Sequence, residues 1–534
     1  MPSPAHLIKQ NTALQQQLQE AQAHLLTLHQ RFAATLIEHD ATLVARDTIL
    51  AERDTTLAQR DVLIRVLREQ LALLKHQRFD ASSEQTPPEQ ARLFDEAEVH
   101  ARREVTVTVP AHRRRLGRPC LPAGLPCIEV HHDLPEDQKI CPHDGTALIQ
   151  IGADTSEQLQ FIPAQVQVLK HIRHKYACPQ CESHVVTAPK PAQLIPKSIA
   201  TPSLLAQVAT SKYADGLPLY RLAAIFRRLD IGIDRTTMAN WMVRVGLQVQ
   251  GLIDLLWQQL LTAPIVHMDE TTLQVLKEPG RAAKTKSYMW VTVAGPPDQG
   301  AVLFHYAPSR SAAIPETLLA SFTGALMTDG YAGYDGLKTI THLGCMAHAR
   351  RKFVEAQRVQ PKGIAGKADE ALEWFKDLYR IEREAAELNV ADRYVLRQAK
   401  ALPVLNALAA WLTATKPTTA PKTALGEAIT YLQRQWPCLI RYLDDGRYPI
   451  DNNRVENAIR PFVLGRKGWL FSASVNGAKA SANLYSLVET AKAHRLNPFE
   501  YLMHVFTHLP AATTPEALQA LLPAQFVAAQ RSIN

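Results

Sequence analysis

Two aspartates occupy positions from which they could bind metal ions. Asp269 lies in the segment PIVHMDET, where an apolar run leads into acids, and Asp329 lies in GALMTDG, where a second apolar run ends in an acid. Carboxylates at the ends of neighbouring strands repel each other unless a cation lies between them, and a pair of divalent ions suits in-line displacement at phosphorus. Oxygen-only ligands favour magnesium or manganese over zinc. The alternative is ordinary turn chemistry, because Asp is common in turns.

Glu456, in the segment DNNRVENAIRP, has a structural interpretation and a chemical one. Asn453 precedes it by three residues, which predicts an asparagine version of a capping box at the start of a helix. Arg460 follows at the spacing of a weak surface ion pair. With two acids on strands upstream, we interpret Glu456 as a third metal ligand, because the first turn of a helix holds a side chain rigidly. Asp451 is the nearest rival acid.

An α/β sheet is predicted to carry these acids. From Ala263 the apolar pattern changes to short runs and period two, which is typical of strands. The long separation between Asp329 and Glu456 requires an insertion, and residues 361–445 are predicted to be helical without strands. The predicted strands are 264–271, 287–295, 301–308 and 324–329, with a helix around 311–322 and a short strand leading into a basic helix over 341–356.

The N-terminal region has the heptad pattern of a helix that associates with a partner helix. A solvated single helix is the alternative, because the second position of the seam is poorly apolar before Leu63. Residues 79–125 follow as a basic linker, which would either lie along a DNA minor groove or be solvated. The heptad positions are Leu36, Leu43, Leu50, Leu57, Ile64 and Leu71, and the basic cluster of the linker is Arg113, Arg114, Arg115 and Arg118.

Two cysteine segments suggest a structural metal. Cys178 and Cys181 form a Cys-x-x-Cys knuckle, whereas Cys141 is followed at the matching spacing by Asp144, with His143 between them. One structural Zn²⁺ bound by this set is one interpretation, and a packed turn without metal is the other. A thioredoxin-like site is disfavoured because no βαβ pattern surrounds the knuckle.

Residues 198–258 predict helices that include a helix-turn-helix. A turn at Asp230–Gly232 precedes a second helix for which Asp234 is the expected N-cap, and Arg235, Thr236 and Thr237 would face outward to DNA. A helical hairpin that does not touch DNA is the alternative. Its expected core residues are Ile225, Leu229, Ile233, Met238 and Trp241.

Composition narrows the class of protein. The chain of 534 residues is long enough for several domains, and its net charge of +8 favours a polyanionic partner such as nucleic acid. Seven cysteines are too few for a disulfide scaffold. The N-terminus lacks a signal-peptide core, and no apolar run is long enough to span a membrane. We therefore expect a cytoplasmic protein without a membrane partner.

Four segments resemble the DDE transposases of the insertion-sequence-66 group, and the resemblance extends over nearly the whole chain. These segments are HMDETTLQVL, MTDGYAGYDGL, GCMAHARRKF and DNNRVENAIRPFVLGRKGWLFSAS. The resemblance implies an RNase H-like catalytic fold in which Asp269, Asp329 and Glu456 bind two Mg²⁺ or Mn²⁺ ions. It also implies a bacterial, nucleoid-associated transposase that cuts and joins DNA. Asp144 departs from the family's cysteine pattern, which puts zinc binding in question.

Such an enzyme would bind the terminal inverted repeats of its element and the target DNA, as a homo-oligomer working with small accessory proteins of the same element. A nuclease that cuts without joining and an inactive DNA-binding regulator are the alternatives. His267 and His348 are candidates for proton transfer, and Trp469 either stacks on a base or packs in the core. The residues expected to contact phosphates near the cut are Arg350, Arg351, Lys352, Arg460, Arg466 and Lys467, with a solvated face as the alternative for about half of them.

The predicted fold class is therefore multidomain α+β. It combines a coiled-coil helix, a zinc-ribbon-like region, a helix-turn-helix domain and an RNase H-like α/β catalytic domain with an all-helical insertion. The predicted boundaries are 1–78 for the coiled coil, 79–125 for the linker, 126–196 for the zinc-ribbon-like region, 197–258 for the helix-turn-helix, 259–360 and 446–480 for the catalytic core, 361–445 for the insertion, and 481–534 for a C-terminal helical region.

Overall fold

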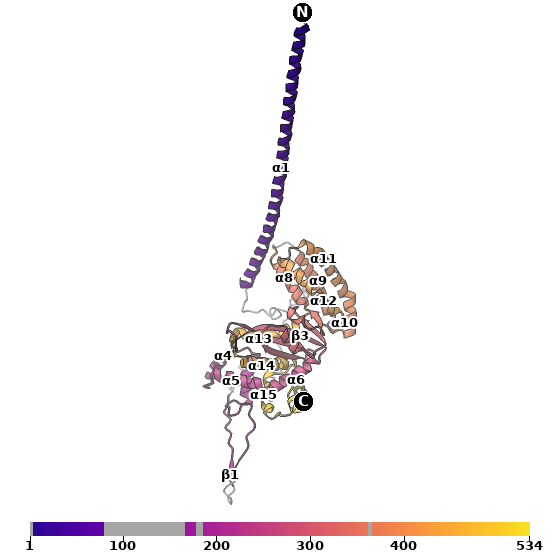
Figure 1. Cartoon of the computed structure of the whole chain (residues 1–534). Coiled ribbons are helices and arrows are strands. Elements are labelled where there is room, and N and C mark those ends of the chain that lie inside the picture. The colour runs from indigo at the N-terminus through magenta and orange to yellow at the C-terminus, as the bar shows by residue number, and fades with distance from the viewer. Residues whose placement is uncertain (1–3, 80–165, 178–184, 361–365, 534) are drawn as a thin grey trace, which may run out of the picture. The chain divides into compact units, whose positions relative to one another are not determined.

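A computed structural model describes residues 4–79, 166–177, 185–360 and 366–533 (Figure 1). The chain divides into two compact units, one formed by Met1–Glu104 with Ala192–Asn534 and the other by Val105–Pro191. The four predicted zinc ligands, Cys141, Asp144, Cys178 and Cys181, lie outside the described residues, as do His143 and the basic cluster at 113–118.

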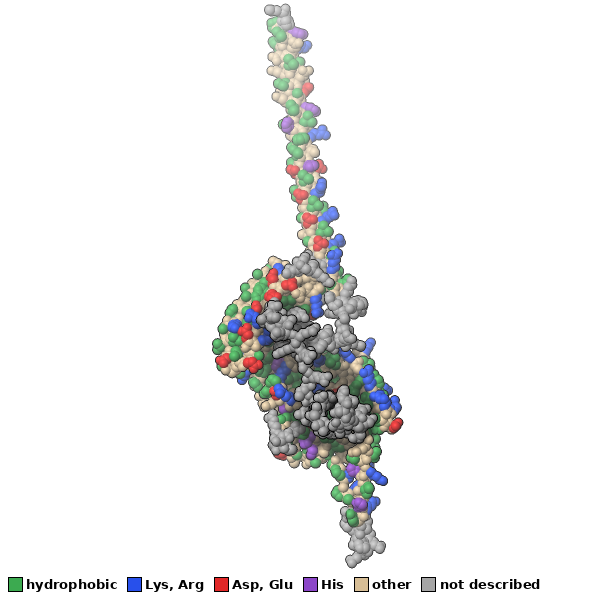
Figure 2. All heavy atoms as spheres, turned by 180° about the vertical axis from the view of Figure 1, so that it is seen from behind, with side chains coloured by type: hydrophobic (Ala, Val, Ile, Leu, Met, Phe, Trp, Pro, Cys, Tyr) green, Lys and Arg blue, Asp and Glu red, His purple; other side chains and the backbone are tan. Residues whose placement is uncertain are grey.

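The N-terminal region is a single helix, α1 (Pro4–Phe79), of 76 residues. All six heptad positions are exposed, from 43% at Leu43 to 53% at Leu57 and Leu71. Figure 2 shows apolar side chains along this helix, interspersed with charged side chains of both signs. The predicted helix is confirmed, and its association with a partner helix stays a prediction.

The second unit contains a short antiparallel pair, β1 (Lys175–Ala177) and β2 (Val185–Thr187), in which Tyr176 lies opposite Val186. The two strands flank the Cys178–Cys181 knuckle in the sequence.

The helix-turn-helix lies among α3 (Pro202–Ala209), α4 (Leu219–Arg227), α5 (Arg235–Gln248) and α6 (Gln250–Leu261). Asp234 caps α5 as expected, since its side chain accepts a hydrogen bond of 2.8 Å from the backbone N–H of Thr237. Ile233, Met238 and Trp241 are buried, but Leu229 is 42% exposed. Its predicted core role was therefore wrong, because α4 ends at Arg227 and Leu229 falls in the turn.

The central sheet has the strand order β5-β4-β3-β6-β7. Strands β3, β4 and β5 are antiparallel neighbours, whereas β6 and β7 run parallel to β3, and the short strand β8 pairs with the distal end of β3. All predicted strands are present, and the short helix α7 (Ala313–Leu318) precedes β6 as expected. The bounds are β3 Ile265–Lys277, β4 Lys286–Ala294, β5 Ala301–Ala307, β6 Ala325–Thr328, β7 Thr341–Gly344 and β8 Ser472–Ser474.

Helix α14 (Val475–Ala493) covers the edge of the sheet at β5. The backbone N–H groups of Val302 and Phe304 donate to the hydroxyls of Thr490 and Ser486, at 3.1 and 2.8 Å. These hydrogen bonds satisfy backbone N–H groups that could otherwise pair with another strand. The helix crosses the boundary predicted at 480, so the C-terminal region with α15 (Pro498–His508), α16 (Pro515–Gln519) and α17 (Pro523–Ile533) packs as a continuation of the core.

The insertion is helical over its described residues, 366–445, as predicted. Its helices surround a separate hydrophobic core that also takes in Met346 and Phe353 of α8 (Met346–Arg358), the helix that follows β7 (Figure 1). Helix α8 therefore joins the sheet to the insertion. The insertion helices are α9 Lys367–Glu384, α10 Val390–Leu396, α11 Leu402–Thr415 and α12 Ala424–Leu439, followed after a connecting segment by α13 Asn453–Trp469.

Candidate active site

Asp269 and Asp329 meet because of the register between β3 and β6. Ile265 pairs with Ala325 and His267 with Met327 in the parallel ladder, so the same register continued by two residues brings Asp269 level with Asp329. Strand β6 ends just before Asp329, but β3 continues past the acids to Lys277. The prediction that β3 ends at its acids was therefore wrong. Strand β6, the parallel partner of β3, ends there instead, so β6 does not pair with the middle of β3.

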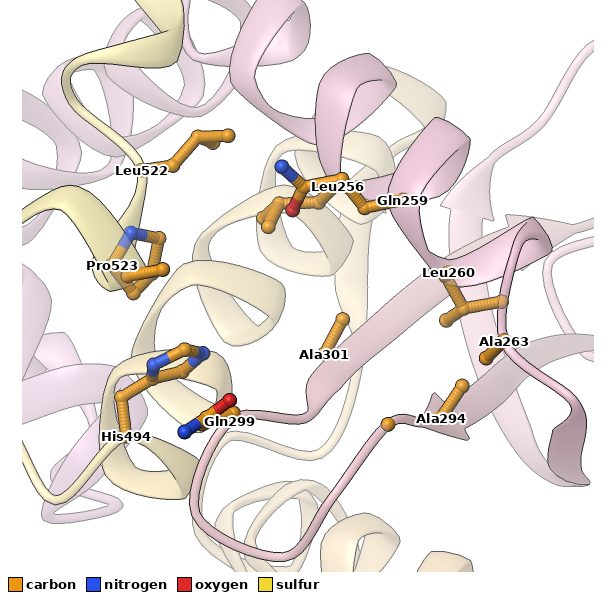
Figure 3. A pocket seen from close by; sticks show the side chains of 12 residues that line it. Leu256, Gln259, Leu260, Ala263, Ala294, Gln299, Ala301, His494, Leu522 and Pro523 are labelled. Atoms are coloured by element: carbon orange, nitrogen blue, oxygen red, sulfur yellow. The ribbon is translucent and has the colours of Figure 1, made fainter.

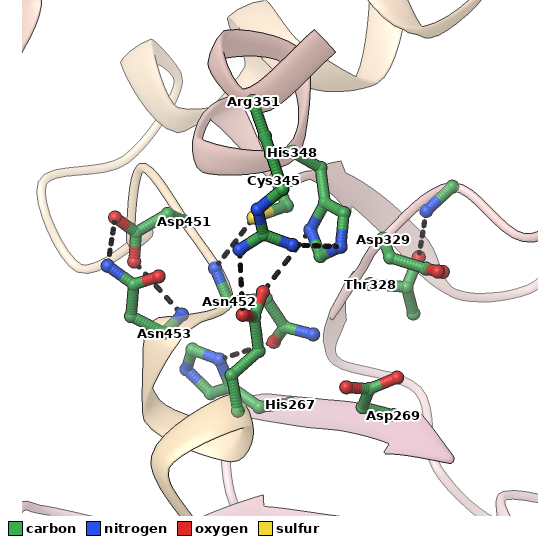
Figure 4. A network of polar contacts seen from close by, with 12 residues as sticks. His267, Asp269, Thr328, Asp329, Cys345, His348, Arg351, Asp451, Asn452 and Asn453 are labelled. Atoms are coloured by element: carbon green, nitrogen blue, oxygen red, sulfur yellow. Dashed lines mark hydrogen bonds and ion pairs between the residues drawn. The ribbon is translucent and has the colours of Figure 1, made fainter. Parts of the chain in front are cut away.

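Neighbouring acids help to raise the pKa of Asp269 and of Glu456. The pKa of Asp269 lies well above its usual value because the side chain is buried and because Glu270, Asp329 and Glu456 are negatively charged neighbours. Burial also raises the pKa of Glu456, to which Asp329 adds, while Arg351 acts against the increase. Three carboxylates from two strands and one helix thus share one electrostatic neighbourhood, and Figure 4 shows Asp269 and Asp329 on adjacent segments.

Glu456 does not form the predicted capping box. The N-cap position of α13 is Asn452, which makes no side-chain cap, and Asn453 already belongs to the helix. Glu456 is buried, and its two oxygens face α8: Oε1 lies 3.2 Å from Nδ1 of His348, and Oε2 accepts a hydrogen bond of 3.2 Å from Arg351. The capping interpretation of Glu456 is therefore wrong, and its interpretation as a metal ligand stays a prediction.

Asn452 connects three segments that lie beside one another near the acids (Figure 4). Its side-chain amide donates to the carbonyl of Met268 at 3.1 Å, its Oδ1 accepts from Nδ1 of His267 at 3.0 Å, and its backbone N–H donates to the sulfur of Cys345 at 3.2 Å. The residue is fully buried. It joins β3, the segment before α8 and the start of α13. The sequence offered no signal for this role beyond a second asparagine in the Asp-Asn-Asn run.

A fourth carboxylate, Glu270, is neutralised by neighbours that the sequence analysis did not single out. Its side chain is 1% exposed, pairs with Arg310 and accepts a hydrogen bond of 2.7 Å from the hydroxyl of Tyr334. Arg310 in turn lies 3.7 Å from the ring centre of Tyr331. Burial raises the pKa of Glu270, while Tyr334 and Arg310 act against the increase. Glu270 therefore has a cationic partner, Arg310, whereas the contact described for Asp269 is with a backbone N–H group.

The two histidines singled out from the sequence both have a lowered pKa. Burial lowers the pKa of His267 to about 4, and burial together with Arg351 lowers the pKa of His348 to about 4. His267 is held by Asn452, which indicates a structural role. His348 touches Glu456 and therefore belongs to the acid cluster. Trp469 packs edge-on against Phe462, as the core interpretation expected.

The basic residues expected near the cut have different surroundings. Arg350 is only 9% exposed, which disfavours a direct phosphate contact by this residue. Arg351 contacts Glu456, and Lys352 pairs with Glu355. The remaining members are Arg460 and Arg466, both half-buried, and the exposed Lys467; Arg466 also donates to the hydroxyls of Thr271 and Thr272 at 3.2 Å.

In the helix-turn-helix, Arg235 and Thr236 are exposed at the start of α5, and Thr237 is half-buried. Asp451 is directed away from the acid cluster, because it accepts hydrogen bonds from the hydroxyl of Tyr379 and from Asn453.

A shallow pocket lies elsewhere, between α6, the β4–β5 turn and the start of α17 (Figure 3). Leu256, Leu260, Ala301 and Leu522 line it together with His494, and no acidic residue contributes. It is therefore separate from the acid cluster.

The acid cluster fits hard divalent cations. Asp269 and Glu456, whose pKa values are raised by desolvation and by neighbouring acids, would be stabilised by a cation lying among the carboxylates, and oxygen ligands suit Mg²⁺ or Mn²⁺. Each of these carboxylates can also accept hydrogen bonds, as Asp269 and Asp329 do from the backbone N–H groups of Glu270 and Tyr331. Those contacts hold the side chains in place and leave further lone pairs for a ligand.

Family models match four parts of the chain. A model described as "Transposase IS66 family" matches residues 197–480, and one described as "zinc-finger binding domain of transposase IS66" matches 138–182, the span that contains the predicted zinc ligands. The "IS66 C-terminal element" matches 486–524, and "Transposase C of IS166 homeodomain" matches 66–130.

Similar proteins occur in Sinorhizobium fredii (strain NBRC 101917 / NGR234). Uncharacterized protein y4jD is 35% identical over 422 residues, which cover 76% of this chain and 81% of the relative. Uncharacterized protein y4qI is 34% identical over 397 residues, 72% of this chain and 73% of the relative. Within the described residues, no helix has the length and apolar character needed to cross a membrane.

Proposed function

Because this chain belongs to the IS66 family of transposases, we propose that it binds the terminal inverted repeats of a bacterial insertion sequence and catalyses metal-dependent cleavage and strand transfer of DNA. The observation that carries the proposal is the proximity of Asp269, Asp329 and Glu456, which are far apart in the sequence: the charge of Asp329 helps to raise the pKa of both Asp269 and Glu456. As a DNA-acting protein it would associate with the nucleoid.

The catalytic core would be RNase H-like. A mixed sheet with an acid on its central strand and a second acid directly after the neighbouring parallel strand is compatible with that fold. The third acid, on α13, comes from the part of the chain that returns after the helical insertion. The division of the chain into domains also stays part of this proposal.

Asp269, Asp329 and Glu456 would hold two Mg²⁺ or Mn²⁺ ions, whose chemistry is to lower the pKa of a water nucleophile and to stabilise charge on the phosphate and the leaving oxygen. Asn452 would keep β3 and α13 in register, so that the carboxylates stay fixed during both cleavage and joining. Arg351 would neutralise Glu456 until DNA and metal arrive.

DNA would be held by two sets of basic and polar groups. Arg235 and Thr236, with Thr237, lie at the N-terminus of α5, where a helix-turn-helix reads or grips a groove. Lys467, Arg466, Arg460 and Lys352 are the proposed phosphate contacts nearer the acids. Helix α1 would mediate homo-oligomerisation, the 138–182 region would bind one Zn²⁺, and small proteins of the same element would act as accessories.

The decisive assay combines purified protein, labelled element-end DNA and Mg²⁺, and follows both cleaved and joined products. We expect Asp329→Ala and Glu456→Ala to abolish both products while DNA binding remains. Cleavage that survives either substitution would contradict the site. Cleavage without joining, with accessory proteins present, would favour a nuclease, and DNA binding by the unaltered chain without cleavage would favour a regulator.

A further inference from the structure

A second group of metal-ligating atoms lies beside the acid cluster. Cys345, His348 and Glu456 each offer one ligand atom, and these atoms lie within 4.8 Å of one another. Cys345 immediately precedes α8, and His348 lies in its first turn, which gives a Cys-x-x-His spacing on one short segment. Glu456 comes from α13 and faces this segment.

These atoms have the burial and the separation of a preformed site. Cys345 and Glu456 are 1% and 2% exposed, whereas 24% of the His348 side chain is exposed, which gives an ion a route from solvent. Among the described residues, neither Nδ1 of His348 nor Oε1 of Glu456 has a hydrogen-bond partner, although the two atoms are only 3.2 Å apart. A nitrogen and an oxygen atom that bind the same tetrahedral Zn²⁺ ion lie about 3.4 Å apart, because each metal–ligand bond is about 2.1 Å long.

We propose that Cys345, His348 and Glu456 form a binding site for a thiophilic divalent cation, such as Zn²⁺, which withdraws Glu456 from the magnesium site and so inhibits the enzyme. Thiolate, imidazole and carboxylate are a zinc-type ligand set, and three protein ligands leave a fourth position for water. When the Zn–S bond forms, the Cys345 thiol releases its proton to solvent. Magnesium prefers an all-oxygen set, so the two cations compete only through Glu456.

Arg351 is the group that opposes this cation. Its guanidinium lies 3.3 Å from Nε2 of His348 and 3.2 Å from Oε2 of Glu456, so it contacts the far sides of both residues and leaves the ligand atoms open. A cation on Nδ1 requires the ring proton to be on Nε2, and Nε2 then no longer accepts a hydrogen bond from Arg351. Binding of the cation therefore releases Arg351 from His348. Removal of Arg351 should tighten the binding.

The binding half of the proposal is tested without any reaction. The full chain is equilibrated with Zn²⁺, freed of loosely held metal, and its zinc content measured; Cd²⁺ then reports the metal–thiolate bond by its charge-transfer absorption. We expect Cys345→Ser and His348→Gln each to hold one equivalent less than the unaltered chain. Cys438→Ser is the matched control, because Cys438 is the other free cysteine among the described residues and should leave the zinc content unchanged.

Serine at 345 can still accept the hydrogen bond from the backbone N–H of Asn452, and the thermal unfolding of each variant checks that it is folded. Arg351→Ala should bind zinc about fivefold more tightly or better, because one nearby positive charge is gone. Equal zinc content in the unaltered chain and in Cys345→Ser would overturn the site, since zinc held in the 138–182 region is common to both.

The inhibitory half rests on the proposed function and has its own test. Zn²⁺ is titrated into Mg²⁺-dependent cleavage, and each variant is compared with its own zinc-free rate. We expect Cys345→Ser to need at least about tenfold more zinc than Cys438→Ser for half inhibition. Zinc bound through Cys345 without any effect on cleavage would overturn the inhibition. A chain that never cleaves DNA would fail the proposed function, and the metal content would still decide the binding site.

Discussion

Two groups of charged residues that are largely withdrawn from solvent are built in opposite ways in this protein. In the helical insertion, Arg397 is 1% exposed and binds both oxygens of Glu382, at 2.8 and 2.6 Å. Its remaining nitrogen donates to the carbonyls of Tyr442 and Asp445. In the acid cluster, burial and like charges raise the pKa of Asp269, and Asp329 and Glu456 are among the three acids whose charges act on it.

The charges of the first group stabilise the fold, whereas the charges of the acid cluster lower its stability. A buried arginine with every nitrogen bonded is part of the architecture, and loss of one partner strands the other in the interior. Buried carboxylates that repel one another lower stability until a ligand neutralises them. Such sites are usually functional. We therefore expect substitutions in the two groups to change stability in opposite directions.

The largest effect is expected at the acids. Asp269→Asn removes a proposed metal ligand, so the cleavage rate should fall by more than the roughly 100-fold loss that follows replacement of residues around a metal. The same substitution removes one of the repelling charges, so the metal-free protein should become about 1 kcal/mol more stable. Initial rates with labelled DNA and thermal unfolding without metal measure the two effects. A variant that is both active and less stable would place Asp269 with the structural charges.

Arg397 should show the opposite behaviour. Arg397→Met leaves Glu382 and two carbonyls buried without a donor, and should destabilise the insertion by about 3–5 kcal/mol. Denaturant unfolding followed by the insertion's tryptophans measures it. The control is Arg380→Met, whose exposed partners Asp377 and Glu384 predict a change below about 0.5 kcal/mol. Equal losses in the two variants would contradict the distinction.

Asn452 belongs to neither group but holds the acid cluster together. Asn452→Ala removes the amide that joins Met268 and His267, so cleavage and Mn²⁺ affinity should fall by about 10–100-fold, with about 1–3 kcal/mol of stability lost. Mn²⁺ titration and cleavage rates follow it. Unchanged Mn²⁺ affinity in a folded variant would remove Asn452 from the positioning role.

The pH dependence of stability tests the repulsion directly. The pKa of Asp269 is raised by folding, so the folded chain keeps a proton that the unfolded chain releases near pH 3.8. Its contribution to stability is full below that pH and is lost as pH rises through the raised pKa. The difference in free energy of unfolding between Asp269→Asn and the unaltered chain, measured without metal, should therefore grow from pH 4 upward. Stabilisation of the unaltered chain by Mg²⁺ should grow in the same direction, and a pH-independent difference would contradict the assignment.

The smallest effect is expected at Asp451, the rival acid in the same segment. Its carboxylate accepts hydrogen bonds from Tyr379 and Asn453, and an amide oxygen can still accept a hydrogen bond in its place. Asp451→Asn should therefore lower cleavage by less than about tenfold. A loss as large as that of Glu456→Gln, measured in the same cleavage assay, would mean that the wrong acid of this segment has been assigned to the site.

The fold was predictable wherever the signal is local. Heptad spacing predicted α1, period two predicted β3 to β7, and Asp234 predicted the start of α5. The prediction was wrong where pairing with a strand distant in the sequence determines the length of an element. Strand β3 continues past Asp269 because β4 pairs with it as far as Gln274, and no residue near Asp269 reveals that partner.

The site was predictable in its acids but not in their partners. Asp269, Asp329 and Glu456 stand out as acids in strongly patterned segments, whereas Arg310 and Asn452 follow no pattern of their own. Arg351 was expected to contact DNA phosphates, with a solvated helix face as the alternative, yet its guanidinium pairs with Glu456.

By itself, the sequence determined which segments are helices and strands, which acids could do chemistry, and the family, because periodicity, capping and motif spacing are properties of neighbouring residues. Tertiary structure alone decided that Asp269 lies level with Asp329, that Asn452 joins β3 to α13, and that Glu456 lies beside Cys345 and His348. These contacts join residues far apart in the chain. They exist only because strand register and helix packing bury the intervening side chains in one arrangement.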